Sequence, residues 1–210
     1  MIISHKKKFL FIHIYKNAGT SIQVALLPHC IGLLHSYYVR FSRKFNIPIP
    51  KKINPYLYGS HSKAKDINEK MGSENFQQYF SFAVVRNPWD WQVSQYKFMR
   101  KNPKHFQHEF IKKMTDFDEY IRWRCTHEVR FQKDFVCSDN DELLVNFIAR
   151  FEKLDSDFGK ICSILGIDAT LPKLNVSNNI PYQKFYTDET RDLISKTFAR
   201  DIEYFEYKFE

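Results

Sequence analysis

Short apolar runs alternate with segments of helical periodicity along most of the chain. Phe9–Ile14 is apolar and rich in aromatic and β-branched residues, which predicts a buried strand, and Tyr79–Val85 predicts a second one. A helical spacing of apolar residues follows each run, beginning at Ile22 and at Trp89. This alternation indicates an α/β fold: a central, mostly parallel sheet with helices on both faces.

Breaker and cap residues predict where the first helices begin and end. Pro28 is expected to stop the first helix, and Pro88 is well placed to begin another. Thr115 or Asp116 is expected to cap a further helix. Residues 30–75 show no clear pattern, and Pro48, Pro50 and Pro55 with Lys51 and Lys52 suggest a long basic loop among them.

The C-terminal part of the sequence is ambiguous at one point. Residues 144–151 fit both a strand and a helix, and we interpret them as a strand because Asp155 or Ser156 can then cap a clean helix. That helix is expected to stop at Gly166. Thr187 is expected to cap a final helix that carries one apolar stripe to its end.

Composition and charge restrict the class of protein. Aromatic residues make up 17% of the 210 residues, which excludes a disordered chain, and the length predicts a single domain over residues 1–210. There are 32 Lys and Arg against 24 Asp and Glu, giving a formal net charge of +8. The surface should therefore attract anions, whether nucleic acid, acidic glycan, phosphorylated cofactor or anionic membrane.

Cysteine spacing and apolar runs indicate the cellular compartment. Cys30, Cys125, Cys137 and Cys162 include no Cys-x-x-Cys pair, which argues against a disulfide scaffold and a four-thiolate zinc site, and favours free thiols. The apolar run after Lys6–Lys8 is too short for a signal peptide, and no run of 18 apolar residues occurs. These features predict a cytoplasmic protein without a membrane span.

The turn after the first predicted strand has the chemistry of an anion site. Its residues are Lys16, Asn17, Ala18, Gly19, Thr20 and Ser21. Unpaired N–H groups at the start of a helix, two hydroxyls and the Lys16 ammonium would all donate to an anion, and Gly19 would let a ligand approach the backbone. The lysine precedes the glycine, and no glycine lies upstream, so the Walker pattern for a nucleoside triphosphate with magnesium is absent.

A second anion-binding constellation follows the second predicted strand. Arg86 stands at the carboxyl end of that strand, where open α/β sheets bind ligands. Ser94 lies about two helical turns further on. An arginine fork and a serine hydroxyl could together hold a second phosphate.

These two motifs, in this order, carry a family resemblance. Phe11–Ser21 resembles the 5′-phosphosulfate loop of sulfotransferases that use 3′-phosphoadenosine 5′-phosphosulfate (PAPS), and Val85–Tyr96 resembles their 3′-phosphate site. Within that family the resemblance is to the carbohydrate type that includes heparan sulfate 2-O-sulfotransferase. It extends more weakly through Arg150–Leu154, Leu174–Ser177 and Asp201–Tyr207, whereas residues 30–57 and 100–140 show no match.

The resemblance implies a P-loop-like three-layer fold and a donor nucleotide. PAPS would be the sulfonyl donor and adenosine 3′,5′-bisphosphate (PAP) the product, with no metal required. The loop from Lys16 to Ser21 would hold the 5′-phosphosulfate. Arg86 and Ser94 would hold the 3′-phosphate, and Ser177 would lie on the same side.

The resemblance also implies catalytic groups and an acceptor. His61 lies within Tyr58–Ser62, at the place of the catalytic-histidine segment of the 2-O-sulfotransferase branch, and would act as base. Lys16 would stabilise charge on the leaving group. The acceptor implied is a hydroxyl of a sugar or glycoconjugate. The sequence does not indicate the oligomeric state.

Three positions depart from the family pattern. The family commonly has proline where this chain has Tyr15, threonine where it has Asn17, and arginine where it has Trp91. Trp91 also lies off the inward stripe of its predicted helix and would face either a cofactor or solvent. The residues expected to bind phosphate are unchanged.

Two other functions remain open at this level. One is a nucleotide or small-molecule kinase with an atypical phosphate loop, against which the missing Walker glycine counts. The other is a non-catalytic module that binds RNA or another polyanion through the positive charge. No RNA-binding signature with interleaved aromatics is visible, so no nucleic-acid partner is expected. His61 could also be only a solvated loop residue.

Overall fold

The computed structural model describes residues 1–50, 54–172 and 180–210, which fall into two units. Unit 1 comprises Met1–Val85 and Asp134–Asn175, and unit 2 comprises Arg86–Lys133 and Val176–Glu210. Each unit is therefore assembled from two separate stretches of the chain.

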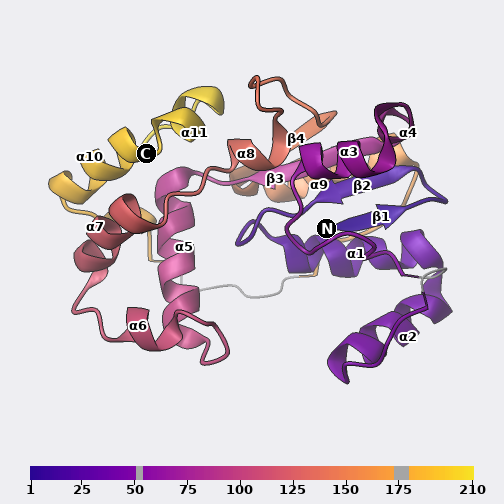
Figure 1. Cartoon of the computed structure of the whole chain (residues 1–210), viewed down its shortest axis with the longest axis horizontal. Helices are drawn as coiled ribbons and strands as arrows, with labels where there is room; N and C mark the ends of the chain where they lie inside the picture. The colour runs from indigo at the N-terminus through magenta and orange to yellow at the C-terminus, as the bar shows by residue number, and fades with distance from the viewer. Residues whose placement is uncertain (51–53, 173–179) are drawn as a thin grey trace. The chain divides into compact units, whose positions relative to one another are not determined.

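A four-stranded sheet forms the centre of unit 1 (Figure 1). Its strands, in spatial and sequence order, are β1 (Ile2–Ser4), β2 (Phe9–Ile12), β3 (Phe80–Val85) and β4 (Phe147–Arg150). The strands β2, β3 and β4 run parallel, whereas β1 pairs antiparallel with β2. The mostly parallel sheet predicted from the sequence is thus confirmed, with β1 as an additional edge strand that the pattern did not reveal.

Both faces of this sheet are buried. Phe9 and Phe82 belong to one face, where they share a core with apolar residues of α1 and α9. Leu10, Ile12 and Ala83 point to the other face, because side chains alternate along a strand, and they too are inaccessible to solvent. The helices of unit 1 are α1 (Gly19–Ile31), α2 (Leu33–Lys44), α3 (Ala64–Met71), α4 (Ser73–Gln77), the 3-10 helix η2 (Phe151–Lys153) and α9 (Leu154–Leu165).

Two expectations for unit 1 were wrong in detail. Helix α1 continues through Pro28 to Ile31, although this proline has no N–H to donate to the preceding turn. Helices α2, α3 and α4, which no sequence pattern predicted, lie on either side of the predicted basic loop around Pro48 and Pro55, part of which falls outside the described residues. The N-cap of α9 is Lys153, which precedes the expected cap residues and provides no side-chain cap bond, although Gly166 does end that helix in a left-handed conformation.

Unit 2 is helical. Its elements are α5 (Pro88–Lys101), α6 (His108–Lys112), α7 (Phe117–His127), η3 (Tyr182–Phe185), α10 (Asp188–Thr197) and α11 (Ala199–Tyr204). The short helix α8 (Lys133–Val136) crosses the boundary between the units, because Lys133 belongs to unit 2 and the rest of the helix to unit 1. Side chains of Asn87, Asp116 and Thr187 cap α5, α7 and α10, as predicted for the last two. The final helix, expected to be continuous, is interrupted at Phe198.

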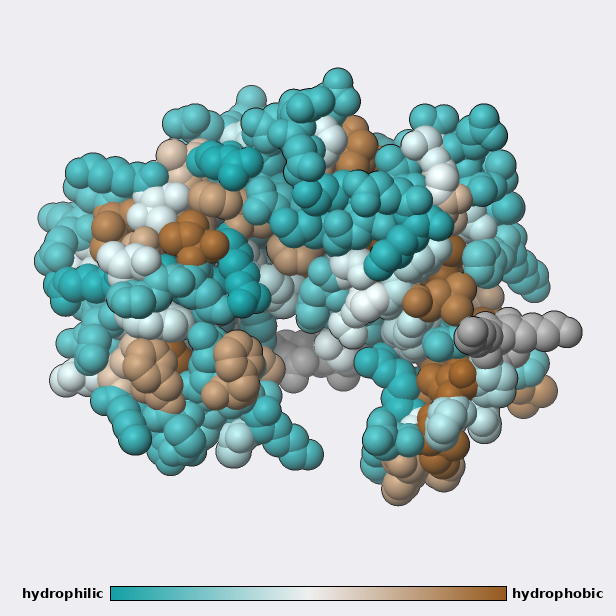
Figure 2. Space-filling view, viewed as in Figure 1, coloured by the Kyte–Doolittle hydropathy of each residue, from teal (hydrophilic) through white to brown (hydrophobic). Residues whose placement is uncertain are grey.

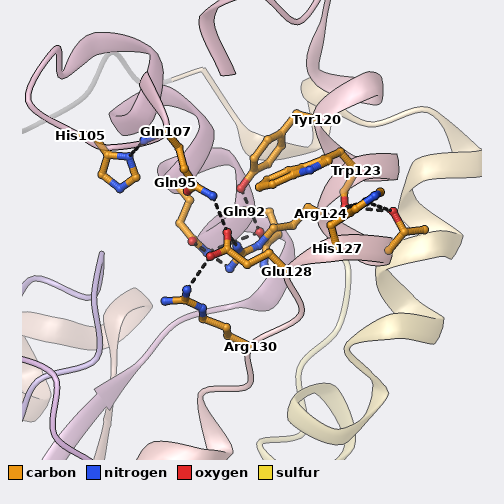
Figure 3. Close-up of polar contacts among 11 residues, drawn as sticks. Gln92, Gln95, His105, Gln107, Tyr120, Trp123, Arg124, His127, Glu128 and Arg130 are labelled. Atoms are coloured by element: carbon orange, nitrogen blue, oxygen red, sulfur yellow. Dashed lines mark hydrogen bonds and ion pairs between the residues drawn. The ribbon is translucent and has the colours of Figure 1, made fainter. Parts of the chain in front are cut away.

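A buried polar cluster joins α5 to α7 within unit 2 (Figure 3). The Arg124 side chain is only 2% exposed, and its guanidinium donates to Glu128 at 2.6 Å and to Gln95 at 3.2 Å. The Glu128 carboxylate also accepts from Arg130 and, at 2.9 Å, from Gln107. Among the described residues, Glu128 is therefore the only acidic side chain that pairs with the deeply buried Arg124 guanidinium.

Replacing Glu128 with alanine should lower the free energy of unfolding by about 3–5 kcal/mol, because it leaves the Arg124 charge buried without its counter-ion. Urea unfolding of the whole chain, followed by circular dichroism, measures the change. Glu189→Ala is the matched control, since it removes the partner of Arg122 in an exposed ion pair and should cause no measurable loss. Equal losses in the two variants would contradict the prediction.

The aromatic residues of α5 pack inside unit 2. Trp89 and Tyr96 are buried, as expected for helix packing. Trp91 is inaccessible to solvent, so the expectation that it lies off the inward stripe was wrong. None of the four cysteines is in a disulfide, which confirms the prediction of free thiols, and burial raises the pKa of Cys30 to about 12. Among the helices of the described residues, none is long and apolar enough to cross a membrane.

Candidate functional site

The loop between β2 and α1 is held in an uncommon backbone conformation. Lys16 and Ala18 both have positive φ, at 67° and 56°, although neither is glycine. Left-handed conformations in non-glycine residues cost about 1–3 kcal/mol each and cluster at ligand-binding and catalytic sites. Asn17, between them, does not share the positive φ, so the backbone alternates in hand, as in the concave nests that bind anions.

The first turn of α1 has no side-chain cap. Its N-cap residue is Ala18, which has no side-chain oxygen to accept from the N–H groups of the first turn. Thr20 is exposed at this end of the helix and Ser21 is largely buried. The α1 N-terminus therefore presents backbone donors and hydroxyls without a competing acceptor from its own N-cap residue.

Gly19 is required by a neighbouring ring. A Cβ atom at this position would overlap the imidazole of His13. The sequence suggested that Gly19 allows a ligand to approach the backbone; the structure shows that the space of its side chain is occupied by His13. The glycine thus lets His13 pack against the start of α1.

Asn17 fastens the loop to the sheet. Its side chain is buried, and its amide nitrogen donates to the carbonyl of Val84 in β3 at 2.8 Å. This bond ties the residue between the two left-handed positions to the neighbouring parallel strand. The departure from the family pattern at Asn17 therefore adds a fixed contact that orients the loop.

His61 lies beside this loop, within unit 1. Its Nδ1 is 2.9 Å from the carbonyl oxygen of His13. Its ring centroid is 4.6 Å from that of His13 and 5.8 Å from that of Tyr15, the residue before Lys16. The structure thus brings together the predicted base and the predicted phosphosulfate loop, which are separated by about 40 residues in the sequence.

The hydrogen bond of His61 determines which nitrogen is basic. A carbonyl oxygen can only accept, so Nδ1 carries the proton and Nε2 has the free lone pair when the ring is neutral. Partial burial lowers the pKa of His61 from its ordinary value of 6.5, against the opposing effect of this hydrogen bond. The ring is therefore predominantly neutral at pH 7 while its outer part remains exposed.

His13 stays neutral as well. Burial, together with the Met1 amine, His61 and Arg43, lowers its pKa to about 3. Its Nδ1 lies 3.2 Å from the side-chain nitrogen of Gln23, which donates to it in this neutral state. The contact of its ring with His61 has no signal in the sequence.

Arg86 and Ser94 belong to unit 2. The backbone N–H of Arg86 donates to Gln132 at 2.9 Å, and the Gln132 amide donates back to the Arg86 carbonyl at 2.7 Å. The Arg86 Nε donates to Asp90 at 2.7 Å within the first turn of α5. Ser94 is half-buried further along the same helix. These contacts hold Arg86 firmly, and no sequence pattern pointed to Gln132 as its brace.

Ser177, the remaining predicted binding residue, lies outside the described residues. The predicted site residues are thus distributed over both units: the loop from Lys16 to Ser21 and His61 in unit 1, Arg86 and Ser94 in unit 2.

A mostly parallel sheet, a strained loop after β2 and an uncapped helix define an α/β protein. The sequence matches the family model described as the sulfotransferase family over residues 1–208, and the chain belongs to that family. An uncharacterised protein of Archaeoglobus fulgidus is 27% identical over 122 residues, which cover 56% of this chain and 94% of that protein. The crystal structure of mouse sulfotransferase SULT7A1 complexed with PAP shares the fold, with a TM-score of 0.51, 15% identity, and coverage of 96% of this chain and 86% of that one.

Proposed function

We propose that this protein transfers a sulfonyl group from PAPS to a hydroxyl of a sugar or glycoconjugate. Membership of the sulfotransferase family supports sulfonyl transfer. The observation that carries the proposal is the loop from Lys16 to Ala18, whose strained backbone leads directly into an uncapped helix. The solved relative in complex with PAP supports the choice of nucleotide.

The groups around the loop fit a phosphosulfate. Backbone N–H groups, the hydroxyls of Thr20 and Ser21 and the Lys16 ammonium are all donors, as binding of a multiply charged anion requires. PAPS, when bound, supplies an activated sulfonyl group. Lys16 and the positive end of α1 would stabilise the negative charge that develops on the leaving phosphate oxygen.

His61 is the proposed general base. Its Nε2 would take the proton from the acceptor hydroxyl as that oxygen forms a bond to sulfur and the bond between sulfur and the leaving oxygen breaks. The hydrogen bond from Nδ1 to the His13 carbonyl keeps the lone pair on Nε2. The lowered pKa keeps the ring able to accept a proton at neutral pH. The chemistry of the proposed step requires no metal.

Arg86 and Ser94 are the proposed ligands of the 3′-phosphate, with Ser177 on the same side. The bond from Arg86 Nε to Asp90 would orient the guanidinium, whose fork geometry suits a phosphate. The sugar acceptor is supported by the resemblance of Phe11–Ser21 and Tyr58–Ser62 to the carbohydrate branch of the family.

Calorimetric titration tests the nucleotide directly. PAP should bind tightly and independently of magnesium, whereas ATP should bind weakly with or without the metal. A preference for ATP with magnesium would replace the proposal with a kinase. Binding of neither nucleotide, together with RNA affinity that falls steeply with salt, would favour a polyanion-binding module.

A further inference from the structure

Helix α2 of unit 1 exposes an apolar stripe. Leu34 is 86% exposed and Tyr37 66%, and the stripe continues through Tyr38, Phe41 and Phe45. These positions recur at spacings of three and four residues, which places them on one side of the helix. Figure 2 shows hydrophobic side chains gathered over this helix. Isolated exposed apolar residues are common, but a continuous exposed apolar stripe is typical of a surface that binds another protein, a membrane or a ligand.

The opposite side of α2 already has its packing partner. Val39 and Ser42 are inaccessible to solvent, and α2 packs against α1. The exposed stripe is thus not the face that attaches the helix to its unit. At the end of the helix, the rings of Phe41 and Phe45 contact each other with centroids 4.6 Å apart, and beyond it Ile47 extends the exposed apolar surface.

Positive charge accompanies the stripe. Arg40 and Lys44 lie one turn apart beside it and are exposed, and α2 contains no acidic residue. The first 65 residues of the chain hold eleven Lys or Arg and no Asp or Glu, whereas the other 145 hold 21 Lys or Arg and 24 Asp or Glu. The positive excess of the protein is therefore carried by the part of the sequence that contains α2.

We propose that α2 docks the protein on an anionic lipid bilayer, lying in the interface with the stripe from Leu34 to Phe45 in the acyl boundary. Tyrosine and phenylalanine suit that boundary, and Arg40 and Lys44 would meet lipid phosphates. Twelve residues give a helix of about 18 Å, which is too short to span a bilayer and long enough to lie on one.

Charge and polarity favour a bilayer over other occupants. A second copy of the chain packed on the same stripe would bring Arg40 and Lys44 close to the same cations of its partner, and neither helix has a carboxylate to offset the repulsion. A polyanionic glycan would meet the cations but would leave the apolar stripe in water. An anionic bilayer satisfies both the charges and the apolar surface.

Co-sedimentation of the full chain with vesicles tests the docking. The protein should bind phosphatidylcholine vesicles that contain about one third phosphatidylserine, and bind them less well in high salt or without the anionic lipid. Leu34→Gln combined with Phe41→Gln should weaken binding tenfold or more. Arg40→Gln combined with Lys44→Gln should weaken it by about 25-fold, at roughly fivefold per charge.

A matched control exposes non-specific adhesion. Leu143→Gln combined with Phe106→Gln makes the same two chemical changes at exposed positions outside α2 and should leave vesicle binding unchanged. Unfolding temperatures of all variants confirm that they fold. No binding to anionic vesicles, or equal losses in the control, would overturn the proposal. So would a dimer, seen by analytical ultracentrifugation, that the α2 variant abolishes.

Discussion

Replacing Lys16 with alanine should lower kcat for sulfonyl transfer by about a thousandfold, the upper end of what the loss of one charge-stabilising donor causes. The reason is that Lys16 lies in the strained loop after β2 and would carry the positive charge nearest the leaving oxygen. Transfer of a labelled sulfonyl group from PAPS, with the first sugar found to accept it, measures kcat. Calorimetry with PAP gives a second readout that needs no acceptor, and its affinity should also fall.

Lys8 offers a matched control for this variant. It too has positive φ, at 51°, and it stands immediately before β2, whereas Lys16 follows that strand. Lys8→Ala therefore makes the same change at the opposite end of one strand and should leave kcat and the affinity for PAP unchanged. Unaltered turnover in Lys16→Ala would remove Lys16 from the mechanism.

Replacing His61 with alanine should lower kcat by about a hundredfold to ten-thousandfold, as expected for loss of a general base. The affinity for PAP should stay nearly unchanged, because the ring would act on the acceptor hydroxyl. The pH profile gives an independent readout. The wild-type rate should fall as the pH drops through a pKa below 6.5, where Nε2 becomes protonated, and the variant should lose this limb.

His5→Ala is the control for the histidine variant. It also removes an imidazole from unit 1, one whose Nδ1 bonds to the Tyr79 hydroxyl at 2.6 Å, and it should keep the full rate and the acid limb. Full activity of His61→Ala would send the base role to another group. Because PAP binding is measured separately, that result would leave the nucleotide assignment intact.

The parts of the fold that follow from local patterns were predicted from the sequence. Strands β2 and β3 are short, largely apolar runs rich in aromatic and β-branched residues, as strands buried on both faces of a sheet require. The cap at Asp116 and the stop at Gly166 each depend on one residue type: aspartate accepts from N–H groups at the start of a helix, and glycine adopts the left-handed conformation that ends one. Strand β1 has only three residues, too few to show a period.

Helix α2 was missed for a physical reason. Its exposed apolar stripe and its buried face lie on opposite sides, so apolar residues do not mark one inward stripe. The prolines and lysines after it indicated only the loop that follows. The interruption of the last helix at Phe198 was equally invisible, because the apolar spacing continues through the break.

The candidate site could be predicted only as far as residue chemistry reaches. The donors of the loop and the histidine could be found in the sequence, because lysine, serine, threonine and histidine carry the functional groups that such a site needs. The bond from Asn17 to Val84 and that between Arg86 and Gln132 are long-range hydrogen bonds between a side chain and the backbone. Such contacts leave no pattern in a single sequence, so only the fold reveals them.

The interleaving of the two units sets the order in which the chain can fold during synthesis. Phe9 and Phe82 share their core with Phe158 and Ile161 of α9, which are made only after the whole first stretch of unit 2. Unit 2 in turn lacks α10 and α11 until residues 188–204 have emerged. Apolar surfaces of the nascent protein are therefore exposed to solvent until the segments that cover them have been synthesised. We expect chaperones to bind these surfaces until translation is nearly finished.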